Sequence, residues 1–194
     1  MPRLKAPQRR EQLIEVATKL FARNGFEATT TSAIALAAGV TEPILYRHFK
    51  NKQELFVAIV RSVSEVTLKA WQSIVAHEQD PIKRIKQVCE AIPDHIKRNG
   101  DAYHVLHGAL STSREKKVLA VMKEHYVQIE RFFAQLVHEG QKAGAFRRNL
   151  DPKAAAWQLI VSGIGYAMIS LNLAPIDRDM TREMIDSIVN GWRA

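Results

Sequence analysis

The sequence has little of what several classes of protein require. It contains one cysteine, Cys89, in 194 residues. A single thiol cannot build an internal disulfide framework or a cysteine-based zinc site, so we expect a reducing, cytoplasmic location. We interpret Cys89 as a small apolar residue that packs in the core.

Catalytic motifs are also missing. There is no HExxH, GxSxG, P-loop or CxxC sequence, and Gly163-x-Gly165 lacks the third glycine of a dinucleotide-binding loop. His104 and His107 share a helical face, but no carboxylate or thiol stands at a spacing that supports metal binding. We therefore expect no catalytic residue, no metal and no cofactor. A helical enzyme that uses scattered histidines remains an alternative.

The chain also lacks a long run free of polar residues. The first ten residues have no apolar signal-peptide core, and the weakly polar run 154–173 includes Gln158, Ser162 and Asn172. We expect a buried helix in that run rather than a membrane span. The net charge of +8 permits an anionic partner, either nucleic acid or a membrane surface, without choosing between them. A membrane-surface or scaffold protein is therefore a second alternative.

Helical periodicity, by contrast, extends through almost the whole chain. Leu13, Ala17, Leu20 and Phe21 recur at helical spacing, and 46% of the residues are apolar, enough for a sizeable core. The fold class that this predicts is all-α. The expected helices cover about 8–24, 31–38, 41–49, 52–76, 81 to a bend or stop near Pro93, 101–111, 113–143, 152–173 and 177–192.

Two short helices around Gly39 are the most informative part of the sequence. Residues 30–52 read TTSAIALAAGVTEPILYRHFKNK, with threonines to cap both helices and a glycine for the tight turn between them. Thr41 is the expected cap of the second helix, and Leu45 and Phe49 are spaced to pack it against its neighbours. This pattern indicates a helix-turn-helix, although most helical hairpins bind no DNA.

The same segment resembles the signature of the TetR family of bacterial transcriptional regulators. The likeness extends over about sixty residues, 8–64, and is specific because many spaced positions match together. Ile44 departs from it, since the family often carries a small hydroxyl residue there, and this favours an apolar contact such as a thymine methyl group. The matching positions are Thr30, Ile34, Ala35, Ala38, Gly39, Val40, Thr41, Leu45, Tyr46, His48, Phe49, Lys52 and Leu55.

This resemblance implies a set of contacts to double-stranded DNA. Hydroxyls at the start of the second helix would meet the phosphate backbone, and the first turn of the third helix would approach base edges. Glu42 suits the amino group of cytosine, and Arg47 suits guanine or phosphate. The implied DNA-binding residues are Thr31, Ser32, Thr41, Glu42, Pro43, Tyr46, Arg47, His48 and Lys52.

The resemblance further implies two domains, an N-terminal three-helix helix-turn-helix DNA-binding domain at 8–64 and a helical ligand-binding and dimerisation domain at 65–194. Small and apolar residues of the last two helices fit a homodimer interface. They are Gly163, Gly165, Ala167, Ile169, Ile185, Ile188, Val189 and Trp192. Candidates to line a pocket for a small apolar or amphipathic ligand are Trp71, Cys89, Tyr103, His104, His107, Met122, Tyr126, Phe133 and Trp157.

The function that follows is sequence-specific transcriptional regulation. A homodimer would place two recognition helices on a pseudo-palindromic operator, since one short helix covers only a half-site. Repression is the family's usual outcome, and a small-molecule inducer would release the DNA by shifting the population of conformations. No membrane association is expected.

Overall fold

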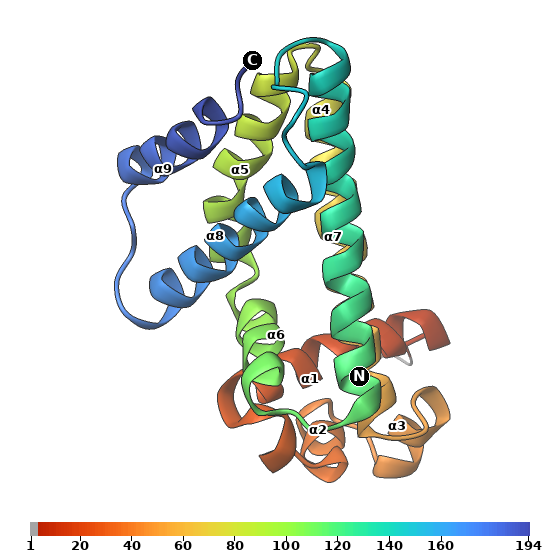
Figure 1. The fold of residues 1–194 in the computed structure, drawn as a ribbon. Helices are drawn as coiled ribbons and strands as arrows, with labels where there is room; N and C mark the ends of the chain where they lie inside the picture. The colour runs from red at the N-terminus through yellow and green to blue at the C-terminus, as the bar shows by residue number, and fades with distance from the viewer. Residues whose placement is uncertain (1–3) are drawn as a thin grey trace. The chain divides into compact units, whose positions relative to one another are not determined.

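A computed structural model describes residues 4–194, and these residues form nine α-helices (Figure 1). The all-α fold expected from the periodicity is confirmed. Some bounds differ from the prediction: the fifth helix continues through Pro93 to Arg98, the first extends to Ala28, and the seventh begins at Lys116. The helices are α1 (Ala6–Ala28), α2 (Thr31–Ala37), α3 (Glu42–His48), α4 (Lys52–Ala76), α5 (Pro81–Arg98), α6 (Gly100–Thr112), α7 (Lys116–Lys142), α8 (Pro152–Asn172) and α9 (Arg178–Asn190).

The chain folds into two compact units. The first contains the described residues up to Ser64 together with Gly100–Glu124, and the second contains Glu65–Asn99 and His125–Ala194. Their limits fall inside α4 and α7, so each of these helices contributes one part to each unit. The segment 100–124, which the sequence assigns to the C-terminal domain, thus clusters with the N-terminal helices.

The first unit is built around α1, which packs against α2 and α6. Three members of its predicted apolar stripe, Leu13, Ala17 and Phe21, are at most 2% exposed, and the fourth, Leu20, is half-buried. Phe26 extends this core: its ring lies 5.4 Å from that of Phe21 and 5.3 Å from that of Phe56 in α4. Burial of each such ring contributes roughly 2–3 kcal/mol, so these aromatic contacts hold the end of α1 against the start of α4.

Gly25 interrupts the helical path of α1 close to its end. Its φ of 78° and ψ of 162° belong to a region that is essentially restricted to glycine. The interruption turns the chain immediately before Phe26, whose ring is then buried. Gly25 therefore ends the regular part of α1, although the helix is assigned as far as Ala28 and its C-cap is Thr29.

The second unit contains an extended apolar core. Trp71 of α4 packs on Phe133 of α7, with ring centroids 5.3 Å apart, and α5 packs against both α8 and α9. The fully buried members of this core include Ile85, Val88 and Val137. Each helix of this unit has one side buried in the core, and this is why apolar residues recur at helical spacing in this part of the sequence.

Ion pairs run along the line where α9 meets α5. Acidic and basic side chains recur at every fourth position on both helices, and their order on α9 is the reverse of the order on α5. The bridges are Lys86–Asp186 at 2.7 Å, Glu90–Arg182 at 3.6 Å and Asp94–Arg178 at 2.6 Å. We call these three pairs the α5–α9 ladder.

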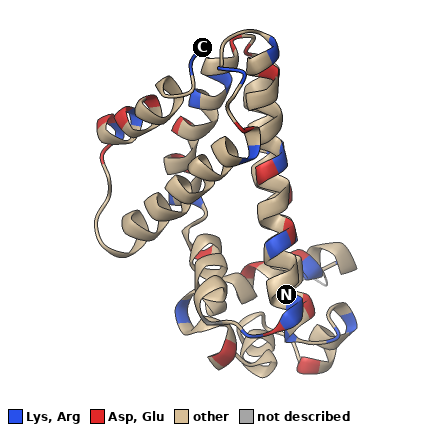
Figure 2. Ribbon diagram, in the orientation of Figure 1, with Lys and Arg blue, Asp and Glu red and all other residues tan. Residues whose placement is uncertain are grey.

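The helix α8 is buried along one side only. Figure 2 shows that it carries almost no charge, whereas α9 carries both signs. Of the described helices, α8 is also the one long and apolar enough to span a membrane, with 28% of its most apolar window buried. Our expectation of a buried helix is therefore wrong for the outer side, where Trp157, Val161, Met168 and Ile169 are 40–62% exposed.

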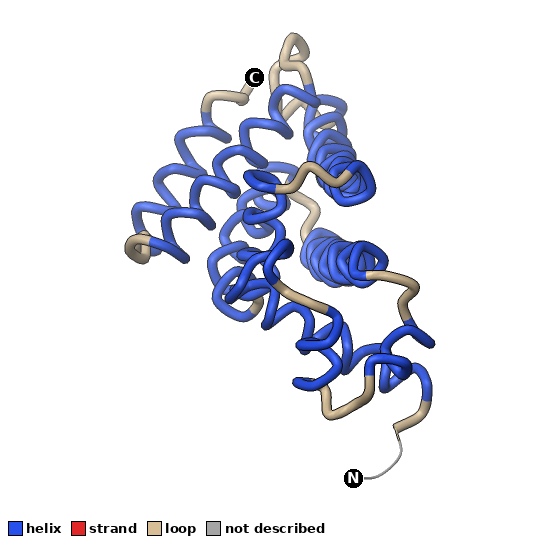
Figure 3. The backbone as a smooth tube through the Cα atoms, turned by 90° about the horizontal axis from the view of Figure 1, so that it is seen from below, coloured by secondary structure: helices blue, strands red, loops and turns tan. Residues whose placement is uncertain are grey.

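Figure 3 shows helices and loops throughout the part of the chain that the structure describes, without a strand. An isolated β-bridge joins Phe146 to Arg193. Phe146 reaches this position because its ring lies directly over Gly140 of α7, where a Cβ atom would approach the ring to 2.3 Å. The glycine is therefore required by close packing, since its φ needs no special freedom.

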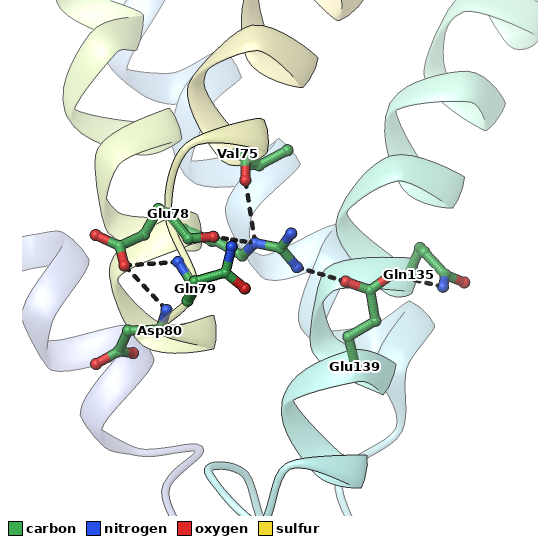
Figure 4. A network of polar contacts seen from close by, with 7 residues as sticks. Val75, Glu78, Gln79, Asp80, Gln135 and Glu139 are labelled. Carbon is green, nitrogen blue, oxygen red and sulfur yellow. Dashed lines mark hydrogen bonds and ion pairs between the residues drawn. The ribbon is translucent and has the colours of Figure 1, made fainter.

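The connection between α4 and α5 is fixed by polar contacts (Figure 4). Arg84 Nε donates to the backbone oxygens of Val75 and Glu78, and its Nη1 lies 2.7 Å from Glu139 Oε2. The Glu78 carboxylate in turn accepts from the N–H groups of Gln79 and Asp80, and the Asp80 bond is the main cause of its lowered pKa. One arginine thus ties the loop to α7.

Candidate nucleic-acid interface

The turn between α2 and α3 is set by backbone geometry. The Thr30 hydroxyl accepts from the N–H of Ala33 at 3.1 Å and so caps α2. Gly39 has a φ of 67°, and the following N–H of Val40 returns to the oxygen of Ala35 at 3.0 Å. Gln12 of α1 donates to the oxygen of Ala38 at 3.3 Å. These contacts fix where α3 begins.

The helix α3 lies on the first unit through its apolar side. Leu45 is fully buried, and Phe49, which follows the helix, is 1% exposed. The guanidinium of Arg10 lies 4.9 Å from the Phe49 ring centre. Thr41 occupies the N-cap position, but its hydroxyl makes no capping bond, so the predicted capping role is wrong in that respect. Its side chain is exposed.

The opposite side of α3 presents polar groups. Tyr46 is 47% exposed, Arg47 and Pro43 are exposed, and Glu42 and His48 are half-buried. Ser32, on α2, is exposed as well. A short helix that presents hydrogen-bond donors and an acceptor is suited to contact base edges in the major groove.

Thr31, Glu42 and Tyr46 form one hydrogen-bonded group on this surface. Thr31 Oγ1 donates to Glu42 Oε1 at 2.5 Å, and Tyr46 OH lies 3.1 Å from Thr31 Oγ1 and 3.4 Å from Glu42 Oε1. We call these three side chains the hydroxyl–carboxylate cluster. It joins the start of α2 to α3, a connection that the separation of the residues in sequence gave no means to predict.

Lys52 has structural contacts in addition to the phosphate role that the resemblance implies. Its Nζ donates to the backbone oxygens of Phe26 and Glu27, at 2.7 and 3.1 Å, and lies 4.5 Å from the Phe26 ring centre. An ammonium group has three protons, so one remains for another acceptor. Lys52 therefore stabilises the end of α1 from the first turn of α4.

The nine candidate pocket residues divide between the units. Tyr103, His104 and His107 on α6 and Met122 on α7 belong to the first unit, and the other five belong to the second. Burial, and next the charge of His104, lowers the pKa of His107. Among residues 4–194 no group of three or more histidine, cysteine or acidic side chains is arranged to hold a metal ion.

The five candidates in the second unit have different environments. Trp71 and Phe133 pack in the core, whereas Tyr126 stacks against the exposed Trp157 with ring centres 6.4 Å apart. Burial raises the pKa of Tyr126 to about 12. Trp157 Nε1 also donates to Glu130 at 2.8 Å, so this ring is held in place at the surface of α8.

A narrow apolar cavity lies between α5, α8 and α9, and Cys89 is the predicted pocket residue that lines it. The cavity is also lined by the polar residues Ser162, Tyr166 and Thr181, which the sequence analysis did not predict. Their positions in the sequence do not indicate that they line the same cavity. The cavity volume of about 40 Å³ has room for a few water molecules. Burial raises the pKa of Cys89 to about 12, so the side chain is a neutral thiol.

Comparisons with known proteins agree with the geometry of the first unit. Residues 13–59 match the model of the family described as bacterial regulatory proteins, tetR family. The nucleoid occlusion factor SlmA of Marinobacter nauticus is 26% identical over 150 residues, 77% of this chain and 75% of the relative.

Solved structures match the fold over almost the whole chain. A transcriptional regulator of the TetR/AcrR family from Thermobifida fusca is 27% identical, with a TM-score of 0.68 over 96% of this chain and all of its own. A regulator from Saccharomonospora viridis, solved in complex with choline, is 19% identical, with a TM-score of 0.81 over 95% of this chain and 96% of its own. The predicted resemblance and fold are thus confirmed, and these relatives are regulators rather than enzymes.

Proposed function

We propose that the chain, whose residues 13–59 match the tetR-family model, is a DNA-binding transcriptional regulator that acts as a homodimeric repressor of a pseudo-palindromic operator. The observation that carries the proposal is the exposed polar side of α3 within the segment that matches the family. We propose that the protein acts in the cytoplasm and does not associate with a membrane.

DNA contacts are assigned by position on α2 and α3. Glu42 and Pro43 approach base edges from the first turn of α3, with Ile44 beside them. Phosphate contacts come from side chains around this turn, whose hydroxyl, guanidinium, imidazole and ammonium groups suit phosphate oxygens. The residues are Thr31, Ser32, Thr41, Tyr46, Arg47, His48 and Lys52.

The homodimer is proposed to form through α8 and α9. On the outer side of α8, Trp157, Val161 and Met168 are exposed, and on α9 Met180 and Met184 are 57% and 41% exposed. An apolar surface that combines several helical turns favours association over exposure to water. Two copies would supply the two recognition helices that an inverted repeat requires.

A small apolar or amphipathic ligand is proposed to bind in the helical body and weaken operator binding. The choline complex of the Saccharomonospora viridis regulator supports a ligand role for this fold. The cavity between α5, α8 and α9 is too narrow for such a ligand as it stands, so binding must widen a site in the body. The helix α4 continues from one unit into the other and is the proposed lever.

A second candidate function comes from the Marinobacter nauticus relative, which is named a nucleoid occlusion factor. As a candidate for this chain, it keeps the proposed DNA binding and assigns no role to a small molecule. Thermal stabilisation by small molecules distinguishes the two: a compound that raises the melting temperature and weakens operator binding supports the inducible repressor.

Selection from a random pool of duplex DNA, in moderate salt and without ligand, tests the common part of both functions. We expect enrichment of an inverted repeat with half-sites about one helical turn apart. Tyr46→Ala should weaken binding to the selected operator at least tenfold, with Glu11→Ala on the exposed surface of α1 as a control. Binding that only fades with salt, without enrichment, would contradict specific regulation.

A further inference from the structure

The hydroxyl–carboxylate cluster can be described by counting its protons. Thr31 and Tyr46 have one hydroxyl proton each, and an ionised Glu42 has none. The Thr31 proton is directed to Glu42 Oε1, so Tyr46 is the donor of its own contacts with Thr31 and Glu42. Both protons therefore point into the cluster, and only oxygen lone pairs remain for an approaching group.

A DNA phosphate is an acceptor and needs those protons. When Tyr46 or Thr31 donates to a phosphate oxygen, its bond to Glu42 must break. The carboxylate then loses that donor while it lies close to the negative backbone of the DNA. Loss of partners and repulsion between like charges both oppose binding.

A base pair compensates this loss in only one of its two orientations. In the major groove, cytosine N4 and adenine N6 present amino groups that donate to a carboxylate, whereas guanine presents only acceptors and thymine an acceptor and a methyl group. Glu42 starts α3, the position from which side chains reach base edges. Every Watson–Crick pair contains one such amino group, on its cytosine or its adenine, so the sequence decides which strand carries it. A duplex that places this group within reach of Glu42 restores a donor, and a duplex that places it on the other strand does not.

We infer that Glu42 couples phosphate contact to base reading, and that it determines specificity mainly by weakening binding to incorrect sequences. This inference rests on the proposed DNA-binding function. Thr31 and Tyr46 are positioning residues: they hold the carboxylate in the free protein and release it when they contact the backbone. The discrimination arises from a penalty on wrong partners in addition to attraction for the right one.

The test compares Glu42→Gln with the parent protein on two duplexes, the selected operator and a scrambled sequence of equal length and composition. Glutamine preserves the shape, removes the charge and adds a donor for phosphate. We expect binding to the scrambled duplex to strengthen about tenfold, and the ratio of the two affinities to fall by about the same factor. Glu11→Gln, an exposed position on α1, is the control for the change in net charge.

A double-mutant cycle with Tyr46→Phe tests the coupling itself. We expect Glu42→Gln to change the affinity ratio severalfold less when the tyrosine hydroxyl is already absent, because the two side chains act as one unit. Equal effects in both backgrounds, or an unchanged ratio in Glu42→Gln, would overturn the inference. Failure of the parent protein to distinguish the duplexes would instead contradict the proposed function. Circular dichroism melts establish that each variant is folded.

Discussion

The helices α3 and α9 are held in place by different forces. The seven residues of α3 depend on the buried Leu45, the adjoining Phe49 and the backbone turn at Gly39. The thirteen residues of α9 add the α5–α9 ladder to the buried Ile185 and Val189. Salt screens partly exposed ion pairs, whereas apolar burial and backbone geometry have no charge interaction to screen. The position of α3, the proposed DNA-reading helix, should therefore depend little on ionic strength, whereas the attachment of α9 should weaken as salt screens its ion pairs.

Of the variants that test this comparison, Leu45→Ala should have the largest effect on stability. Leu45 has no exposed surface, so truncation leaves a cavity in a small core, and we expect the free energy of unfolding to fall by about 3 kcal/mol. Urea denaturation followed by circular dichroism measures the loss. Ile185→Ala in α9, at an 8% exposed site, is the matched variant and should cost less. A larger loss at Ile185 would reverse the proposed order.

Backbone geometry gives the next largest effect. Gly25→Ala should lower the free energy of unfolding by about 2 kcal/mol, because the φ and ψ of Gly25 lie in a region that is essentially restricted to glycine. Gly39→Ala should cost about 1 kcal/mol, since its φ of 67° suits a left-handed turn that other residues occasionally adopt. No atom lies within 4 Å of the added methyl group at either site, so backbone strain alone is tested. Equal losses in thermal melts would show that the difference in ψ has no consequence.

A pH effect should appear in the second unit. His95 is buried, its Nε2 lies 3.0 Å from Thr67 Oγ1, and burial followed by the charge of Arg98 lowers its pKa. The unfolded chain therefore binds more protons below the ordinary histidine pKa, so stability is complete above about pH 6.5 and declines as the pH falls.

Urea midpoints at pH 7.5 and 5.5 measure this decline, and His95→Gln should reduce it. His107, whose pKa is lowered as well, contributes a change of the same sign. A protein that gains stability on acidification would contradict both assignments.

The smallest expected effect concerns the α5–α9 ladder. Arg182→Gln should cost no more than about 0.5 kcal/mol, because both side chains of the Glu90 pair are more than two-fifths exposed. Lys86→Met should cost slightly more, since the lysine side chain is only 21% exposed. Both losses should shrink in 1 M salt, whereas the Leu45→Ala loss should not. If the loss of stability in Arg182→Gln did not change with salt, ion pairs would not contribute to the attachment of α9.

The two short helices around Gly39 were predicted well from the sequence, because the residues that determine them act locally. A glycine at a tight turn and a threonine at a helix start each act on neighbouring residues, and the structure has Gly39 and Thr30 at those places. Thr41 shows the limit, since residue type gave the cap position correctly and the capping bond incorrectly.

Contacts between distant segments could not be predicted in the same way. The Lys52 ammonium reaches carbonyls 25 and 26 residues away, and the Thr31–Glu42 bond depends on how α2 meets α3. In the second unit, aromatic type alone did not separate the core residue Trp71 from the surface residue Trp157. Periodicity shows that a helix has an apolar side, but not which neighbour covers it, as the half-exposed α8 demonstrates.

The contact between Gly140 and Phe146 has an evolutionary consequence. A side chain at position 140 and an aromatic ring at position 146 exclude each other, so the two positions should change together as sequences diverge. A homologue with alanine at the first position should carry a smaller residue at the second, and a homologue with a large ring at the second should retain glycine at the first. In an alignment of many such chains, this pair should give a strong covariation signal.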